Sequence, residues 1–192
     1  MLGSRLTRDA VLAYDGALSL YGLAPLGHSI SFLTQERVRP FRFNEVVYRP
    51  VLTGRALESG EDGLQVLERA GQKLLATTLE RTFVDLLDRL DLAPGLVELW
   101  RCFAAAGQLD TTAMIRQVRA LESRLVAARV GLFLEERRSA TPSELHLLRS
   151  MGPRSSSYFD RNLRSPEDVY FGQWKLVVPA KLLSAMRYSR AG

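Results

Sequence analysis

Three carboxylates recur at every third residue in the middle of the chain, at Asp85, Asp88 and Asp91. Side chains at this spacing fall within a partial turn of a helix, where carboxylate oxygens can hold a hard cation. Arg81, however, lies four residues before Asp85 and Arg89 four residues after it, a spacing that favours intrahelical ion pairs. Asp91 also precedes a further helix, whose dipole favours a carboxylate at that place. The pattern therefore predicts ion pairs and no metal site.

These carboxylates are not accompanied by a known catalytic signature. The sequence contains no glycine-rich phosphate loop ending in Lys-Ser/Thr, no dinucleotide fingerprint, no paired-histidine zinc helix and no serine nucleophile elbow. His28 and His146 have no partner close in sequence, and Cys102 lies among apolar residues of a helix, as a buried small hydrophobe would. We therefore predict a protein with no catalytic residues and no cofactor. The alternative is an enzyme whose polar groups meet only in the fold, with Asp85 as general base.

Arginines form the second group of candidate functional residues. Arg37, Arg39, Arg42 and Arg49 crowd one predicted hairpin, and Arg137 and Arg138 close the long helical region. Interleaved with Phe41, Phe43 and Tyr48, the hairpin arginines could hold single-stranded nucleic acid by stacking and phosphate contact. The aromatic residues share one face in the expected register and are more simply core residues. The six arginines are then a candidate rim of a nucleic-acid or protein surface.

Length, hydropathy and charge limit the class of protein. With 192 residues of which 46% are hydrophobic, the chain is long enough for one domain with its own core, and we expect residues 1–192 to form a single domain. The formal charge of +5 is carried by the two ends, because residues 58–136 hold nine basic and thirteen acidic residues. No apolar run approaches the roughly 20 residues that cross a bilayer, and no secretory signal is visible. We expect a cytoplasmic protein without a membrane partner.

The elements that position these residues can be predicted from local patterns. Thr77 and Glu80 form a capping box, which predicts a helix over residues 78–90. Leu79, Phe83, Leu86, Leu87 and Leu90 form its apolar stripe, and Arg81, Asp85, Asp88 and Arg89 lie off this stripe. Further helices are expected at residues 8–20, 96–106, 111–121 after Asp110 as cap, 124–135, and 141–150 with a capping box at Thr141 and Glu144.

Strands are expected mainly in the first half of the chain. A short strand is expected around Ile30, a hairpin at residues 39–49 turning at Asn44-Glu45, a loop at residues 55–63, a second hairpin at residues 65–77, and a late strand at residues 173–178. In the first hairpin we expect Phe43 opposite Val46 and Phe41 opposite Tyr48. The fold class is therefore α+β: an antiparallel sheet built from two hairpins plus a late strand, packed against several α-helices. The motif Tyr158-Phe159-Asp160-Arg161 receives no role.

The run from Leu75 to Leu92, followed by Ala93-Pro-Gly, resembles the C-terminal domain of the AbiEi antitoxin family of bacterial type IV toxin–antitoxin (abortive-infection) systems. Glu80, Arg81, Thr82 and Asp85 belong to this motif helix. The opening helix and later landmarks of the family are similar to residues 10–23, 30–34, 37–51, 129–135 and 174–179, in the same order. The resemblance extends over nearly the whole chain and depends on this order, because no single motif is diagnostic.

The resemblance implies a noncatalytic antitoxin and transcriptional-regulator domain used in phage defence. It would counteract a nucleotidyltransferase-like toxin without a stable complex and support autoregulation of the operon. In the family, operator DNA is bound by an N-terminal winged helix-turn-helix, and no such module is expected in this chain. Gly3-Ser4 is not followed by the Asp-x-Asp of the toxins, so the chain does not resemble the toxin. The alternatives are a stand-alone nucleic-acid-binding protein that uses the arginine-rich hairpin and the enzyme centred on Asp85.

Overall fold

The computed structural model describes residues 7, 9–25, 27–54, 61–69 and 71–191. The chain divides into two compact units, Met1–Asp85 and Leu86–Gly192, and the division falls inside one helix. The expectation that residues 1–192 form a single domain stays a prediction.

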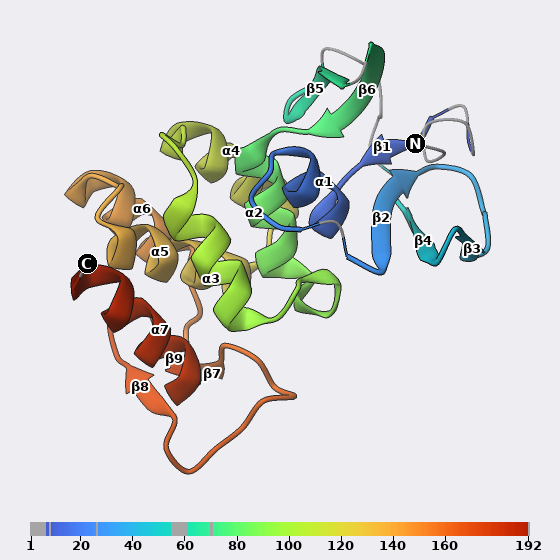
Figure 1. Cartoon of the computed structure of the whole chain (residues 1–192). Helices are drawn as coiled ribbons and strands as arrows, with labels where there is room; N and C mark the ends of the chain where they lie inside the picture. Colours follow the sequence, from blue (N-terminus) through green and yellow to red (C-terminus); the bar gives the residue numbers. More distant parts are fainter. Residues whose placement is uncertain (1–6, 8, 26, 55–60, 70, 192) are drawn as a thin grey trace. The chain divides into compact units, whose positions relative to one another are not determined.

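The first unit is built on a six-stranded sheet of order β3-β4-β2-β1-β6-β5 (Figure 1). Neighbouring strands are antiparallel in β1–β2, β3–β4 and β5–β6, but parallel in β1–β6 and β2–β4. The α+β class is therefore confirmed, while the purely antiparallel sheet was wrong. The strands are β1 (Val11–Leu12), β2 (Ser29–Thr34), β3 (Phe41–Phe43), β4 (Val46–Leu52), β5 (Leu64–Arg69) and β6 (Gln72–Thr77).

Both predicted hairpins form, because turn residues and strand periodicity are local signals. Phe43 pairs with Val46 and Phe41 with Tyr48, as the sequence predicted. The turn residues Asn44 and Glu45 both have positive φ, 44° and 64°, which is the conformation of a tight turn that matches strand twist. The expected buried aromatic face is only partly correct, since Tyr48 is buried but Phe43 is 44% exposed at the edge strand. Most of the loop predicted at residues 55–63 lies outside the described residues.

The first helix, α1 (Tyr14–Leu20), begins later than the periodicity predicted. Val11 and Leu12 form β1 instead, where they pair with β2 and β6, so long-range strand pairing overrides a local helical pattern. Helix α1 contacts β2 closely: a Cβ on Gly16 would lie 2.8 Å from the Ser31 carbonyl oxygen. A residue larger than glycine would therefore push the helix off the sheet.

Helix α2 (Leu79–Asp88) follows β6 directly, and the turn η2 (Leu90–Leu92) follows after Arg89. Phe83, Leu86 and Leu87 are fully buried, as expected for the apolar stripe. Leu79 and Leu90 at its two ends are only half-buried.

The second unit contains helices and a small sheet. Helices α3, α4 and α5 match the predicted segments, with Asp110 and Ser123 accepting hydrogen bonds from the amides of Ala113 and Val126. Helix α6 starts at the predicted capping box of Thr141 and Glu144. Helix α7 was not predicted. The helices are α3 (Leu96–Ala105), α4 (Thr111–Leu121), α5 (Arg124–Arg137), α6 (Pro142–Met151) and α7 (Ala180–Ala191).

The predicted late strand does not join the large sheet, which corrects the expected topology. Strand β9 (Leu176–Val178) is the centre of a separate sheet of order β7-β9-β8, with β7 (Ser157–Tyr158) and β8 (Val169–Phe171) on either side. Its partners are strands of two and three residues, too short to leave a periodic signal. Around it, α3 packs beside α7 and α5 beside α6 (Figure 1).

An aromatic cluster holds the core of the second unit together. The ring of Phe133 on α5 lies edge-on to Trp100 and Phe103, at centroid distances of 5.2 and 5.3 Å, and stacks on Phe159 at 5.8 Å. All four side chains are at most 1% exposed. Such pairs contribute about 0.5 to 1.5 kcal/mol each beyond the area they bury.

Candidate functional site

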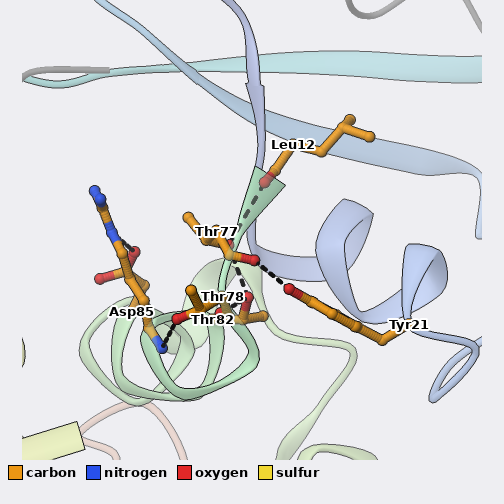
Figure 2. Close-up of polar contacts among 7 residues, drawn as sticks. Leu12, Tyr21, Thr77, Thr78, Thr82 and Asp85 are labelled. Carbon is orange, nitrogen blue, oxygen red and sulfur yellow. Dashed lines mark hydrogen bonds and ion pairs between the residues drawn. The ribbon is translucent and has the colours of Figure 1, made fainter. Parts of the chain in front are cut away.

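The residues that the sequence singled out around the start of α2 form a network of polar contacts within the first unit (Figure 2). The cap of the helix is one residue later than predicted. Thr78 Oγ1 accepts from the Arg81 amide at 3.3 Å, and the Thr82 amide donates to the Thr78 carbonyl at 2.8 Å. The expected capping box of Thr77 and Glu80 was therefore wrong: Thr77 still belongs to β6, and its hydroxyl has other partners.

Thr77 connects three elements of the first unit. Its hydroxyl lies 2.7 Å from the Thr82 hydroxyl, which also donates to the Thr78 carbonyl at 2.8 Å. The Thr77 hydroxyl reaches the Leu12 carbonyl of β1 at 3.5 Å. Thr77 and Thr82 are fully buried, so these contacts satisfy hydroxyl groups that would otherwise be costly to bury. The network ties the start of α2 to β1 and β6.

Tyr21, next to the end of α1, extends the network. Its hydroxyl donates to the Thr77 carbonyl at 2.6 Å and accepts from the side-chain amide of Gln65 on β5. Burial raises the pKa of Tyr21, the hydrogen bond from Gln65 opposes this rise, and the charge of Glu80 adds to it. The phenol therefore stays protonated and serves as a donor at neutral pH.

Arg81 and Asp85 form a buried ion pair one turn apart on α2. Arg81 Nε donates to Asp85 Oδ2 at 3.3 Å, and the two side chains are 4% and 8% exposed. The predicted pairing is confirmed, and both residues are buried although they lie off the apolar stripe of the helix. A charged side chain can be buried when an opposite charge compensates the loss of hydration, and the four-residue spacing supplies that partner.

Asp88, Arg89 and Asp91 behave differently from Asp85. Arg89 donates to both carboxylate oxygens of Asp91, at 2.8 and 2.7 Å, and its expected pairing with Asp85 stays a prediction. The hydrogen bonds from Arg89 hold the pKa of Asp91 below its ordinary value. Asp88 is exposed. Among the described residues, no group of three His, Cys, Asp or Glu side chains is arranged to hold a metal ion.

The hairpin arginines form an exposed set in the first unit. Arg37, Arg39, Arg42 and Arg49 are all exposed, and Arg42 lies 3.8 Å from Glu45 across the turn. The neighbouring aromatic rings are engaged with each other: Phe41 and Tyr48 stack in parallel at 4.9 Å. The hairpin therefore offers charge to a partner, with Phe43 as its one strongly exposed aromatic ring among the described residues.

Arg137 and Arg138 lie in the second unit and differ from each other. Arg137 donates to the carbonyl oxygens of Ala106 and Gly107, the latter at 2.7 Å, and lies over the ring of Phe103. Burial lowers the pKa of the Arg137 guanidinium. Arg138 is exposed and ends α5 with a φ of 58°. Arg137 therefore has a structural role, and Arg138 is the member of this pair that is available on the surface.

Sequence reasoning missed Arg129, a buried arginine of the second unit. Its Nε donates to the Phe159 carbonyl at 2.8 Å, one terminal nitrogen donates to the Leu87 carbonyl at 2.6 Å, and the guanidinium lies over the Phe159 ring. Burial lowers the pKa of Arg129 to about 10, against the attraction of Asp160 and Asp88. A lone charge inside the apolar run 126–134 was the signal available in the sequence.

The second unit also contains a pocket of about 470 Å³ at the first turns of α3 and α7. Its wall is mainly apolar, formed by side chains such as Leu96, Val97 and Leu182. Charged side chains of both signs surround it: Glu98, Glu167 and Asp168 against Arg101, Arg164 and Lys181. This balance favours neither anionic nor cationic ligands. None of the described helices is long and apolar enough to span a bilayer.

Comparison with known proteins places the fold but not the chemistry. No protein-family model matches the chain, and no curated protein matches it significantly. The crystal structure of the RV2827C protein from Mycobacterium tuberculosis is similar, with a TM-score of 0.64 and 13% sequence identity. The similarity covers 97% of this chain and 68% of that chain. At this identity the likeness shows the fold alone.

Proposed function

We propose that this chain is an antitoxin domain of the AbiEi kind, which counteracts a nucleotidyltransferase-like toxin of a type IV toxin–antitoxin system and supports autoregulation of its operon. The proposal rests on the ordered resemblance of the segments described above. In this family operator DNA is read by a winged helix, so the residues described here supply the antitoxic part. No cofactor is needed for such a role, and no stable complex with the toxin is expected.

The burial and hydrogen bonds of the polar side chains on the motif helix α2 support a structural role for them in preference to an enzyme centred on Asp85. A general base must reach the proton that it removes. The Asp85 carboxylate is 8% exposed and faces Arg81, while the Thr82 hydroxyl is bonded to Thr77 and Thr78. The polar residues of the motif are thus engaged with other parts of the same chain.

Co-expression is the direct test of this proposal. The nucleotidyltransferase-like protein encoded beside this chain would be induced in a bacterial host with and without the chain, and growth measured. We expect growth to be restored while affinity purification recovers no stable complex. Absence of such a neighbouring gene, or growth arrest that the chain does not relieve at equal expression, would count against an antitoxin.

The noncatalytic part of the proposal has its own test. Calorimetric titration with nucleoside triphosphates and Mg²⁺, followed by turnover assays, is expected to show neither binding nor product. Stoichiometric, metal-dependent nucleotide binding would overturn it, and loss of that binding in Asp85→Asn would point to the alternative enzyme.

The exposed arginines of the first hairpin keep a second candidate open, a stand-alone nucleic-acid binder. Contacts from dispersed arginines to phosphate carry no sequence information. Binding should then be indifferent to sequence, sensitive to salt, and of roughly 10⁻⁴ to 10⁻⁶ M strength near physiological ionic strength. A mobility-shift titration with the operon's own promoter and a scrambled duplex tests this. Replacing Arg37, Arg39 and Arg42 by Ala should weaken both equally, whereas a strong operator preference would mean that the chain reads DNA by another surface.

A further inference from the structure

The small sheet of the second unit presents a row of two tyrosines and a valine on one face. Tyr158 of β7 and Tyr170 of β8 are both aligned with Val177 of the central strand β9. Residues aligned across neighbouring strands point to the same side of a sheet. The strand spacing of about 4.8 Å separates the two tyrosines by roughly 10 Å, with Val177 between them.

The two faces of this sheet differ in burial. Leu176 and Val178 of β9, which point to the opposite side, are fully buried in the core of the unit. Tyr158 and Tyr170 are 36% and 54% exposed, and Val177 is half-buried. Core packing therefore accounts for one face and leaves the tyrosine row on the surface.

A cation lies against one end of the tyrosine row. The guanidinium of Arg164 lies 4.3 Å from the centre of the Tyr158 ring, and Arg164 Nε donates to the Arg161 carbonyl. Lys175, just before β9, donates to the main-chain carbonyl of Arg154 at 2.9 Å. Arg154, Arg161 and Arg164 are exposed.

The acidic residues of the same loop are partly occupied by backbone amides. Asp160 accepts from the Asn162 amide at 2.8 Å, and Asp168 accepts from the amides of Ser165 and Ala180 at 3.0 and 3.4 Å. These carboxylates hold the loop between β7 and β8 in shape. Glu167, exposed, is the remaining acidic side chain of this loop. Together with Arg154 and Lys175, the cations of this loop outnumber its three carboxylates by one, and Arg164 is the cation that lies over a tyrosine ring.

We propose that the face formed by Tyr158, Val177 and Tyr170 binds an unpaired stretch of nucleic acid. Bases of any sequence can stack on tyrosine rings and on the plane of an arginine that already covers one of them. The surrounding arginines and Lys175 complement the phosphate backbone. The first hairpin offers one exposed ring, Phe43, and no row of exposed rings, since its Phe41 and Tyr48 rings are stacked on each other and Tyr48 is buried. This proposal does not depend on the antitoxin role.

Fluorescence anisotropy with labelled oligonucleotides tests it on the full chain. The probes are oligouridylate and oligothymidylate of about ten nucleotides, within the range that a single stacking platform occupies, together with a duplex of equal length and a polyglutamate peptide. We expect both single strands to bind more tightly than the duplex, and the peptide not to bind. Tighter binding of the oligouridylate would identify RNA as the preferred ligand. Tighter binding of the oligothymidylate would identify single-stranded DNA as the preferred ligand.

Tyrosine variants separate stacking from charge. Tyr158→Ala and Tyr170→Ala should each weaken single-strand binding by roughly tenfold, the usual loss for one stacked base, while Tyr158→Phe and Tyr170→Phe retain it. Tyr188→Ala is the matched control, because Tyr188 is 85% exposed on α7 and outside the sheet. Arg37, Arg39 and Arg42 replaced together by Ala serve as the charge control, with little effect expected.

Tyr170→Ala keeps the test decisive even if removal of Tyr158 disturbs the loop, because Tyr170 is the more exposed of the two. The proposal is overturned if the single strands do not bind, if they bind no better than the duplex or the peptide, or if the alanine variants bind like the parent chain.

Discussion

Gly131 in α5 lies directly against the indole ring of Trp174: a Cβ at residue 131 would come within 2.1 Å of the Trp174 Cη2 atom. Two further contacts hold the ring in this place: Trp174 Nε1 donates to Glu135 at 2.6 Å, and the Arg149 guanidinium lies 4.8 Å from the ring centre. Trp174 is 2% exposed. A glycine in the middle of a helix is thus explained by the ring that it admits.

Gly131→Ala should destabilise the second unit. An alanine normally stabilises a helix interior by about 0.5 to 1 kcal/mol over glycine, but a methyl group forced into the indole ring should cost more, in the range of about 1 to 3 kcal/mol. Urea unfolding followed by tryptophan fluorescence measures the net effect. The control is Gly107→Ala, since nothing lies within 4 Å of a Cβ at residue 107. An unchanged or raised stability for Gly131→Ala would contradict the close contact.

Phe83→Ala tests the apolar stripe of α2. The Phe83 side chain is fully buried, so its removal should cost about 3 to 5 kcal/mol in the free energy of unfolding. Leu79→Ala on the same helix is the comparison, and it should cost less because Leu79 is half-buried. A loss at Phe83 below about 1 kcal/mol in urea melts would rule out the core role.

Elements coded by neighbouring residues were predictable, and elements made by distant pairing were not. The Asn44-Glu45 turn and the caps Asp110 and Thr141 act over a few residues, and the hairpin and helices that they define form as predicted. The two-residue strand β1 gains its structure from β2 and β6, which lie far along the chain. The parallel pairing of β2 with β4 and of β1 with β6 likewise produces no pattern in the local sequence. Helix α7 is different, because Leu182, Leu183 and Met186 repeat at helical spacing and could have been recognised.

The candidate site shows the same limit at the level of side chains. The pairing of Arg81 with Asp85 followed from their spacing, but their burial did not, because charge alone favours an exposed face. The role of Tyr21 in the same network depends on the Thr77 carbonyl, fifty-six residues away in sequence. Chemistry that depends on such long-range contacts could be recognised only from the fold.

Cys102 should be unreactive in the folded protein. The side chain is 1% exposed, and burial together with the charge of Glu98 raises the pKa of the thiol from its ordinary 9.0 to about 11. At pH 8 the thiolate fraction is then about a hundredfold lower than in the unfolded chain. A thiol reagent such as 5,5′-dithiobis(2-nitrobenzoate) should label the protein rapidly only in urea. Equally fast labelling without urea would mean that the thiol is accessible.

The same pKa difference predicts how stability changes with pH. The unfolded chain releases the thiol proton near pH 9, whereas the folded chain keeps it up to about pH 11. The contribution of Cys102 is therefore fully present below pH 9 and is lost as pH rises through the folded value. Urea melts from pH 8 to 11 should show a steeper loss of stability for the parent chain than for Cys102→Ala. Parallel curves would contradict the raised pKa.

The buried pair of Arg81 and Asp85 yields a double-mutant test of what the motif helix does. Asp85→Ala removes the carboxylate that faces a buried guanidinium and should cost about 3 to 5 kcal/mol, whereas replacing both residues by apolar ones of similar volume, Arg81→Met with Asp85→Leu, should recover most of that loss. The free energies of unfolding of Arg81→Met, Asp85→Leu and the double variant give the coupling energy. If the double variant is stable and still relieves toxin-induced growth arrest, the pair serves the fold. A stable double variant that no longer relieves the arrest would assign the two charges a direct part in antitoxin function. The two side chains would then have to become exposed when the chain acts.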